Sequence, residues 1–357
     1  RNSRIFILNI NYRSTPQILK ACMNLIGNNT RKIEKELKTS NPPGDEVILL
    51  ESCNEETESL NIVNEIRDLV GQRNYRYRDI AVIYRANFQS RNLEETFSRM
   101  KIPYHIENGL NFYQRTEVRC LLDYLRLIDS LDSEEGDEAL KAIINMPTRY
   151  ISRKFMQELS EFARKKNVHL FEALKTMPID LPYVRKSVRD LISFITPLAD
   201  YAPNLCPSEV LQMIRNEFDM DRFFTDSDLP APDDSKLQNI NQLQLASARY
   251  SNIRSFLEYT DSFDETISDD KEGVALLTVH KSKGLEFKIV FLVGLVEGIS
   301  PSRRGDIEEE RRIAFVGISR AREILYISFS QNYMGQPAKK SVFIDEILGT
   351  SQHADAS

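Results

Sequence analysis

The chain has 357 residues, of which 41% are hydrophobic and 28% are charged, and its formal net charge is −6. This length allows two domains of ordinary size or one large domain with an insertion, and the composition is that of a globular protein. No apolar run approaches the roughly 18 residues that a membrane span requires, which excludes a membrane-spanning protein, and the negative charge argues mildly against a protein that coats nucleic acid.

The four cysteines are scattered along the chain without a C-x-x-C spacing: Cys22, Cys53, Cys120 and Cys206. This pattern predicts neither a zinc site nor a disulfide framework, and it fits a reducing, cytoplasmic location best. The chain opens at Arg1 without a methionine, directly ahead of an apolar stretch, which is expected of a piece of a longer polypeptide.

Short apolar runs near both ends of the chain predict buried strands, because each run is bounded by polar or turn residues. They occupy residues 4–9, 47–51, 80–85, 274–279, 288–294 and 324–329. Between several of them, apolar residues recur at spacings of three and four, which predicts helices at residues 15–26, 58–70 and 94–100. Strands that alternate with helices predict an α/β fold with a mostly parallel sheet flanked by helices.

The middle of the chain, from about residue 113 to residue 263, has mostly helical patterning. Its clearest helices are predicted at residues 118–128, 153–165, 184–198 and 207–218. Because strand-like segments flank this region, the simplest organisation is one discontinuous α/β domain, residues 1–112 and 269–348, with a mostly α-helical domain, residues 113–268, inserted in a loop. Residues 349–357 are expected to form a disordered tail.

The first segment with chemical content reads Asn11-Tyr12-Arg13-Ser14-Thr15-Pro16, and it lies between a predicted strand and a predicted helix. Ser14 or Thr15 can cap that helix, and Pro16 suits its first turn. Arg13 is then held at the carboxyl edge of a strand, where α/β proteins place ligand-binding groups. The plainer alternative is a surface arginine in a turn.

The second segment, residues 274–301, joins two predicted strands through the loop His280-Lys281-Ser282-Lys283-Gly284, which is followed closely by Glu286. A connection between two buried strands needs only a turn. This concentration of charged residues therefore favours a loop that meets a phosphate, a sugar or a base. For His280 taken alone, a structural role is the plainer interpretation.

The third segment, residues 306–328, predicts a helix that begins with Asp306 and three glutamates, whose carboxylates complement the positive end of the helix dipole. Arg311 and Arg312 are expected as partners of these glutamates. Arg320 lies after the helix and before a predicted strand. A planar guanidinium held there is suited to stabilising a phosphoryl group during its transfer.

These three segments resemble, in order, motifs IV, V and VI of the UvrD/PcrA/Rep family of superfamily 1 DNA helicases. The matching stretches are N-Y-R-S-T, T-V-H-K-S-K-G-L-E-F and E-E-E-R-R-I-A-F-V-G-I-S-R-A. Residues 84–91 and 109–113 are also similar to family segments. The resemblance therefore extends from about residue 4 to residue 348, and it is weakest in the helical middle.

In this family two RecA-like domains enclose ATP, and the resemblance implies that this chain is the second of them, with its helical insertion. Arg13 and Arg320 would then be the catalytic arginines that reach the γ-phosphate, and Glu286 would contact the nucleotide sugar. Single-stranded DNA would be contacted on the opposite edge of the domain by Arg85, Asn87, Thr278 and His280.

The resemblance also implies a cofactor and partners. ATP with Mg²⁺ would be held mostly by an N-terminal RecA-like half. The partners would be that half, single-stranded DNA, junctions of single- and double-stranded DNA, and repair or replication proteins, with no membrane. Closure around ATP and reopening after hydrolysis would move the parent protein 3′ to 5′ along DNA.

Some family features are not found in the sequence. There is no G-x-x-x-x-G-K-[ST] and no acidic D-E-x-x box ahead of Arg13, so the chain alone is predicted to be inactive as an ATPase. The family's Gly-Ile-Gly loop, which helps to bind duplex DNA, corresponds to residues 148–153, where neither glycine is present. This weakens the expectation of a close backbone approach to a duplex. Ile10 and Asn108 stand where family members often have Gln and Gly.

Two other functions are kept as alternatives. One is a non-catalytic module that retains the helicase shape to bind DNA or a protein. The other is the helicase part of a RecB-like or AddA-like nuclease, although those chains are generally much longer. The leading expectation is the C-terminal half of an ATP-dependent 3′–5′ DNA helicase or translocase.

Overall fold

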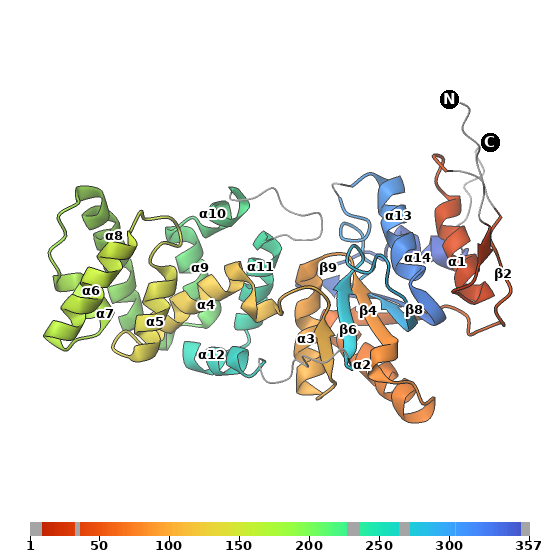
Figure 1. Ribbon diagram of the computed structural model, residues 1–357, viewed down its shortest axis with the longest axis horizontal. Coiled ribbons are helices and arrows are strands. Elements are labelled where there is room, and N and C mark those ends of the chain that lie inside the picture. Colours follow the sequence, from red (N-terminus) through yellow and green to blue (C-terminus); the bar gives the residue numbers. More distant parts are fainter. Residues whose placement is uncertain (1–8, 33–35, 227–235, 264–271, 304, 351–357) are drawn as a thin grey trace. The chain divides into compact units, whose positions relative to one another are not determined.

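The computed structural model describes residues 9–32, 36–226, 236–263, 272–303 and 305–350. These residues divide into two compact units, which are drawn in Figure 1. The first unit holds the described residues up to Leu110 and those from Glu272 onwards, and the second holds those from Asn111 to Phe263. The strand predicted at residues 4–9 lies outside the described residues except for Asn9. Most of the predicted tail also lies outside them.

Within the described residues, the first unit is built on a seven-stranded sheet. Its parallel strands follow the spatial order β3-β8-β7-β4-β6-β5, and a short antiparallel strand, β9, pairs with β8. The strands are β3 (Ile48–Asn54), β4 (Ile80–Tyr84), β5 (Tyr104–Ile106), β6 (Val274–Thr278), β7 (Phe287–Leu292), β8 (Ala321–Tyr333) and β9 (Gln336–Pro337). The predicted α/β class with a mostly parallel sheet is therefore confirmed.

A second, smaller sheet lies near the start of the described chain. It consists of β1 (Ile10–Asn11) and β2 (Lys38–Thr39), which pair in parallel. The strand β5 was not predicted, because three residues are too few to show a period.

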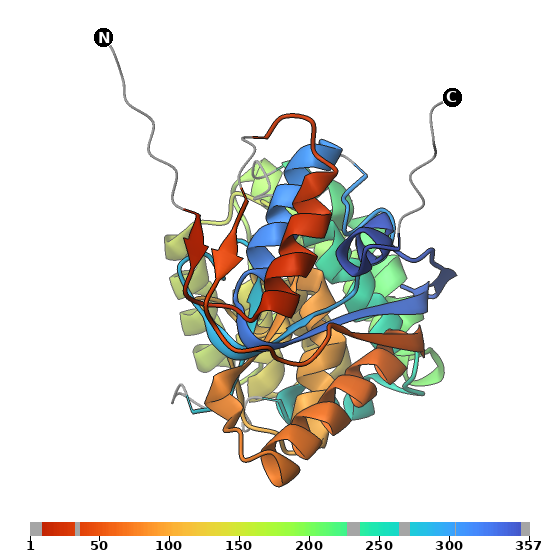
Figure 2. The ribbon, with the colours of Figure 1, turned by 90° about the vertical axis from the view of Figure 1, so that its right-hand side faces the viewer.

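The main sheet is covered on both faces, which explains why its central strands are continuously apolar. Alternate residues of β4 belong to different hydrophobic clusters: Ala81 and Ile83 face one, and Ile80 and Val82 face the other. The first cluster includes α1 (Pro16–Gly27), α13 (Ile307–Ile318) and α14 (Val342–Leu348). The second includes α2 (Glu55–Gln72) and α3 (Ser90–Arg99). Figure 2 shows α1 and α13 side by side on their face of the sheet.

The second unit is helical in its described residues. Its helices are α4 (Thr116–Asp129), α5 (Glu134–Ile143), α6 (Arg153–Lys166), α7 (Leu170–Thr176), α8 (Pro182–Tyr201), α9 (Pro207–Glu217), α10 (Met220–Asp226), α11 (Lys236–Ser247) and α12 (Ile253–Asp261). The four helices predicted in this region correspond to α4, α6, α8 and α9. Helix α4 is buried along most of its length and packs against α5, α8, α9, α11 and α12, so it forms the centre of this unit.

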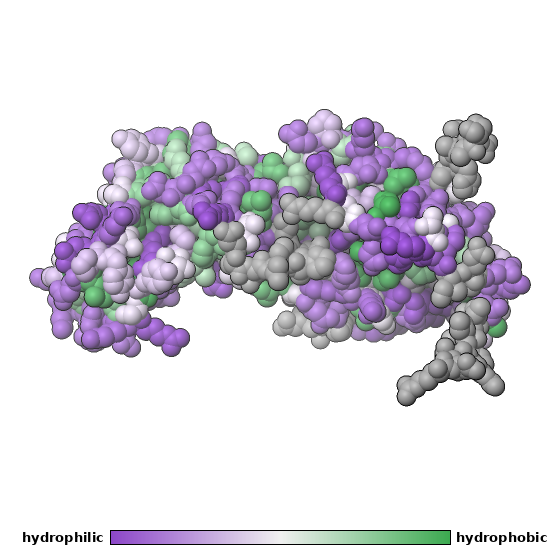
Figure 3. Space-filling view, turned by 90° about the horizontal axis from the view of Figure 1, so that it is seen from above, coloured by the Kyte–Doolittle hydropathy of each residue, from purple (hydrophilic) through white to green (hydrophobic). Residues whose placement is uncertain are grey.

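Short 3-10 helices complete the described structure at Tyr77–Asp79, Asn87–Gln89, Phe112–Gln114 and Ala202–Asn204. The face shown in Figure 3 is mainly hydrophilic, with scattered hydrophobic residues. Among the described residues, no helix is long and apolar enough to cross a membrane.

Candidate nucleotide and DNA sites

The turn that carries Arg13 is built by Asn11. The side-chain Oδ1 of Asn11 accepts hydrogen bonds from the backbone N–H groups of Arg13 (2.8 Å) and Ser14 (2.9 Å), which closes a tight turn after β1. The Ser14 hydroxyl donates to the carbonyl of Ala321 at 2.7 Å, and Thr15 N donates to the carbonyl of Arg322 at 3.2 Å. The turn is thereby fastened to the first residues of β8.

Two predictions for this turn need correction. Thr15 occupies the N-cap position of α1 and Pro16 follows it as expected, but the Thr15 side chain makes no capping hydrogen bond, and the Ser14 hydroxyl donates to Ala321. Arg13 does follow a strand, β1, but that strand belongs to the small sheet. Relative to the main sheet, Arg13 lies at the amino ends of the strands and not at their carboxyl edge.

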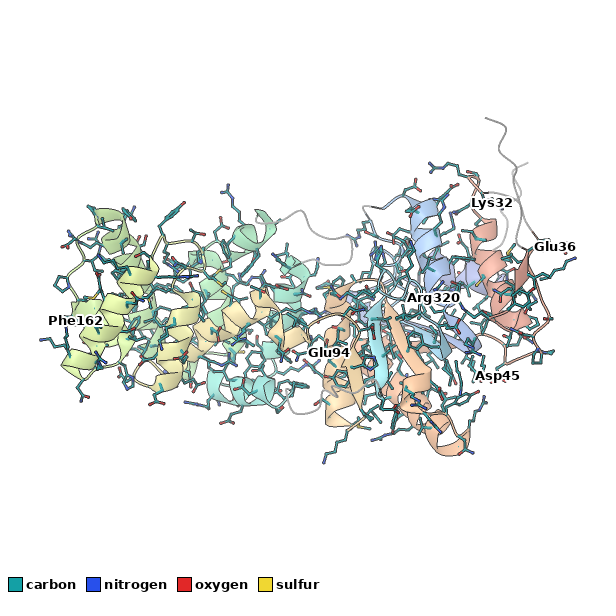
Figure 4. The ribbon with its side chains drawn as sticks, viewed as in Figure 1. Lys32, Glu36, Asp45, Glu94, Phe162 and Arg320 are labelled. Atoms are coloured by element: carbon teal, nitrogen blue, oxygen red, sulfur yellow. The ribbon has the colours of Figure 1, made fainter. Side chains whose placement is uncertain are left out.

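Arg13 and Arg320 meet at Ser319, immediately after the end of α13. Arg13 Nη1 donates to the Ser319 carbonyl at 3.1 Å, and Arg320 Nη2 donates to the Ser319 hydroxyl at 3.0 Å. Arg320 is also held by the carbonyls of Val316 (2.9 Å) and Leu285 (3.1 Å), and Figure 4 shows it close to the end of α13. Burial first, and then the neighbouring charge of Arg13, lower the pKa of Arg320 below its ordinary value.

Glu286 joins the cluster from the residue just before β7. Its Oε2 accepts a hydrogen bond from Arg13 Nε at 2.8 Å, and its Oε1 lies 3.4 Å from Arg322 Nη1. The structure therefore brings together the three residues predicted for the nucleotide site, Arg13, Glu286 and Arg320. They lie where β7 and β8 begin, since Phe287 and Ala321 are paired at the first positions of these strands.

An open pocket of about 360 Å³ lies beside this cluster, and its lining includes Arg13 and Glu286 but not Arg320. The other lining residues, Asn11, Tyr12 and Arg322, were not among the predicted site residues. Tyr12 is 75% exposed, so its ring is available to stack on a flat group. Arg322 lies two positions after Arg320. Its closeness in sequence to Arg320, within the third segment (residues 306–328), was the signal available for it.

The four residues predicted to contact DNA gather at the opposite edge of the sheet. Arg85 and Asn87 follow the last residue of β4, while Thr278 ends β6 and His280 comes two positions later. Because β4 and β6 are parallel neighbours with Tyr84 beside Thr278, these residues share the carboxyl edge of the sheet.

Their side chains differ in accessibility. His280 is exposed and Asn87 is half-buried, whereas Thr278 and Arg85 are buried. The hydroxyl of Thr278 accepts the backbone N–H of Lys281 at 3.4 Å. Arg85 makes a bidentate ion pair with Glu310 of α13, at 3.0 Å from Nε and 2.8 Å from Nη2. In this structure the guanidinium of Arg85 is therefore turned to the protein interior, and its contact with DNA stays a prediction.

The first turn of α13 is acidic, as predicted. Asp306 caps the helix by accepting the N–H groups of Glu308 (3.0 Å) and Glu309 (3.1 Å). The predicted pairing of Arg312 with a glutamate is confirmed, at 2.9 Å from Glu309. Arg311 pairs instead with Glu346 of α14, because its side chain points towards that helix.

The carboxylate of Glu308 binds the loop that follows α1. It accepts the hydroxyl of Thr30 at 2.6 Å, the N–H of Thr30 at 2.7 Å and Nε of Arg31 at 3.1 Å. These hydrogen bonds, that from the Thr30 hydroxyl first, lower the pKa of Glu308 to about 2. The start of α13 is thus fixed to the far end of α1, while Arg13 and Arg320 meet at the other end of this helix pair.

The segment at residues 148–153, in the second unit, is closely tied to the protein. Tyr150 has a left-handed backbone (φ 56°) and is 75% exposed. Beneath it, buried Arg149 donates to the carbonyl of Ile143 at 3.0 Å and to the hydroxyl of Tyr124 at 2.7 Å. A non-glycine residue thus adopts a conformation that favours glycine.

Comparisons with known proteins agree with the motif pattern. A family model described as the UvrD-like helicase C-terminal domain matches residues 6–332. Relatives include an ATP-dependent DNA helicase Rep of Buchnera aphidicola (32% identical, covering 92% of this chain and 54% of the relative) and a DNA helicase II of Rickettsia typhi (32%, 92% and 51%). An ATP-dependent DNA helicase PcrA of Staphylococcus epidermidis is 33% identical, covering 97% of this chain and 50% of the relative.

The chain spans about half the length of these relatives. The matched region contains both edges described above and the helical unit, and the mostly parallel sheet is that of a RecA-like helicase domain. The chain belongs to the UvrD-like helicase C-terminal domain family.

Proposed function

We propose that this chain is the C-terminal motor half of an ATP-dependent DNA helicase or translocase that moves 3′ to 5′ along single-stranded DNA. The observation that carries the proposal is the cluster of Arg13, Glu286, Arg320 and Arg322 at the amino edge of the sheet. The guanidinium groups of Arg13 and Arg322 line an open pocket with the Glu286 carboxylate, and Arg320 lies close by at Ser319. This concentration of cations suits a polyphosphate. The relatives named above are ATP-dependent DNA helicases or DNA helicase II.

In this proposal, Arg13 and Arg320 stabilise the charge that develops on the transferred phosphoryl group. Glu286 binds the nucleotide sugar, and Tyr12 is placed to stack on the base. The sequence contains no phosphate-binding loop of the G-x-x-x-x-G-K-[ST] type, so this loop would belong to a partner motor domain. We assign Mg²⁺ to the same domain. Among the described residues, no group of three or more His, Cys, Asp or Glu side chains is placed to hold a metal ion.

Single-stranded DNA would run along the carboxyl edge of the sheet, where His280 and Asn87 are accessible. ATP and DNA would thus act on opposite edges of one domain. Repair or replication proteins and DNA junctions are further proposed partners of the complete protein.

The test is the turnover of ATP by the complete protein that contains this chain. Arg13→Ala and Arg320→Ala should each lower kcat by about 10³-fold, because an arginine at the transferring phosphoryl group contributes on that order. Nucleotide binding should change much less. Arg312→Ala is the matched control, since Arg312 lies on α13 but pairs with the exposed Glu309. Turnover that survives both arginine substitutions would contradict the proposal and favour a non-catalytic binding module.

A further inference from the structure

Helix α13 joins the two edges of the main sheet. Glu310, in its first turn, contacts Arg85, which directly follows the carboxyl end of β4. Beyond its other end lies Arg320, whose backbone carbonyl accepts the N–H of Phe287 (3.0 Å) at the amino end of β7. At 1.5 Å per residue, this helix of 12 residues bridges about 18 Å between the edges.

The contact between Arg85 and Glu310 is buried as well as bidentate. The two side chains are 8% and 4% exposed, and Glu310 Oε2 also accepts the N–H of Ser302 at 3.1 Å. A charged pair that has been taken out of water holds its geometry closely, because separating the partners leaves a buried charge uncompensated. Arg85 and the first turn of α13 are therefore expected to move together.

This ion pair lies inside the edge at which DNA is proposed to bind. Asn87 starts a 3-10 helix two residues after Arg85, and Tyr84, just before Arg85, is paired with Thr278 of β6. A displacement of this edge reaches Arg85 through the backbone alone. Helix α13 can transmit this displacement because it packs tightly on the sheet. A Cβ at Gly317 would lie 3.1 Å from Cδ1 of Leu292 in β7.

We propose that Arg85 and Glu310 are positioning residues, whose ion pair transmits the state of the DNA-facing edge through α13 to Arg320. The inference rests on the proposed function, and it gives Arg85 a role other than direct contact with DNA. When single-stranded DNA occupies the carboxyl edge, the pair sets the place of Arg320 for ATP hydrolysis. Loss of the pair uncouples hydrolysis from DNA without removing any group that touches the nucleotide.

The same helix offers a matched control. Arg311 makes a bidentate ion pair with Glu346, at 2.8 Å from both Nε and Nη2, and these side chains are 13% and 4% exposed. This pair also anchors α13, but to α14 and not to the carboxyl end of a sheet strand. A purely structural role would make the two pairs equivalent. If the pair of Arg85 and Glu310 couples DNA to ATP hydrolysis, its loss should lower kcat, whereas loss of the other pair should not.

The experiment measures ATP turnover of the complete protein at increasing concentrations of single-stranded DNA. For Glu310→Gln, kcat at saturating DNA should fall about tenfold, a common size for coupling between two sites, while the DNA concentration for half-maximal stimulation changes little. Arg85→Lys keeps the charge but not the bidentate geometry, so its kcat should lie between that of wild type and that of Arg85→Gln. The double variant Arg85→Gln/Glu310→Gln should lose no more kcat than the more affected single variant, because both substitutions break the same ion pair. Glu346→Gln should lower the unfolding temperature but retain kcat per folded molecule.

Three results would overturn the inference. The first is a Glu310→Gln variant that changes only the DNA concentration for half-maximal stimulation. The second is an equal loss of kcat in Glu346→Gln, and the third is a double variant with the summed loss of both single variants. Failure of the proposed function would give a different result, because DNA would then not stimulate ATP turnover by the wild-type protein. In that case the inference would also fail.

Discussion

Single residues set the charge pattern of the candidate nucleotide site. Ser319 separates two arginines, since its carbonyl accepts from Arg13 and its hydroxyl accepts from Arg320. Glu286 binds Arg13 from the other side and also approaches Arg322. Like charges held this closely repel one another, so each guanidinium needs partners of its own to stay in place. The hydrogen bonds to carbonyls and to Glu286 provide them.

Glu308 gives a prediction at this scale. Its pKa is lowered from the ordinary 4.5 to about 2, so the folded protein binds this proton less readily than the unfolded chain does. The carboxylate therefore stabilises the fold above pH 4.5, and this contribution is lost as the pH falls towards 2. Glu308→Gln should lower the free energy of unfolding at about pH 7, and its deficit relative to wild type should shrink by about pH 3.

Urea unfolding at several pH values measures this difference. Glu309→Gln is the control, because the neighbouring carboxylate is exposed and pairs only peripherally, with Arg312 at 2.9 Å. It should change the stability little at any pH. A deficit of Glu308→Gln that stays constant from neutral to acidic pH would argue against an ionised Glu308 as the stabilising group.

At the scale of elements, local signals were sufficient for most helices and strands. The start of α13 followed from Asp306 and the glutamates behind it, which act within one helical turn. Pairings between distant segments could not be predicted in this way. The partner of Arg85 is 225 positions away, and that of Arg311 is 35 positions away on another helix. The burial of Arg85 therefore became visible only in the folded chain.

Arg149 gives a prediction for the helical unit. Its guanidinium is buried, bonds carbonyls at the end of α5 and the Tyr124 hydroxyl, and lies 4.9 Å from the ring of Phe218. Arg149→Met would leave these buried polar groups without their donor. The substitution should therefore lower the free energy of unfolding by about 2–4 kcal/mol.

Thermal or urea unfolding of the chain, followed by circular dichroism of its helices, is the measurement. Arg153→Met serves as the control, because Arg153 starts α6 with an exposed side chain. It should cost less than about 0.5 kcal/mol. Equal stabilities for the two variants would mean that Arg149 does not support its loop.

At the scale of the whole molecule, the strand order explains how distant motifs form two sites. Segments near residues 13, 286 and 320 meet because β7 and β8 start side by side. The sequence motifs, read through a family resemblance, predicted this group and a second group on the opposite edge of the domain, but they did not predict which edge of the sheet each group occupies. They did not single out Tyr12 or Arg322, since contact with the pocket depends on how the turn after β1 is fastened to β8.

The chain taken alone should neither hydrolyse ATP nor grip DNA strongly. It lacks a phosphate-binding loop, and its net charge of −6 opposes binding to phosphates. Fluorescence anisotropy with a labelled single strand should detect binding only below about 50 mM salt. Tight binding at about 150 mM salt, or ATP turnover by the chain alone, would contradict this prediction.

The crowding of guanidinium groups around Ser319 has a consequence for the rate of the proposed ATP hydrolysis. In the proposed function, a polyphosphate that binds beside Ser319 would meet arginine side chains whose hydrogen bonds already fix their directions. Water around an ion in solution must reorient as charge shifts during a reaction, but dipoles and charges held by a folded backbone need little reorientation. The free-energy cost of bringing the mutually repelling arginines together is met when the chain folds. If the proposed function holds, the site is therefore organised for phosphoryl transfer before any nucleotide arrives.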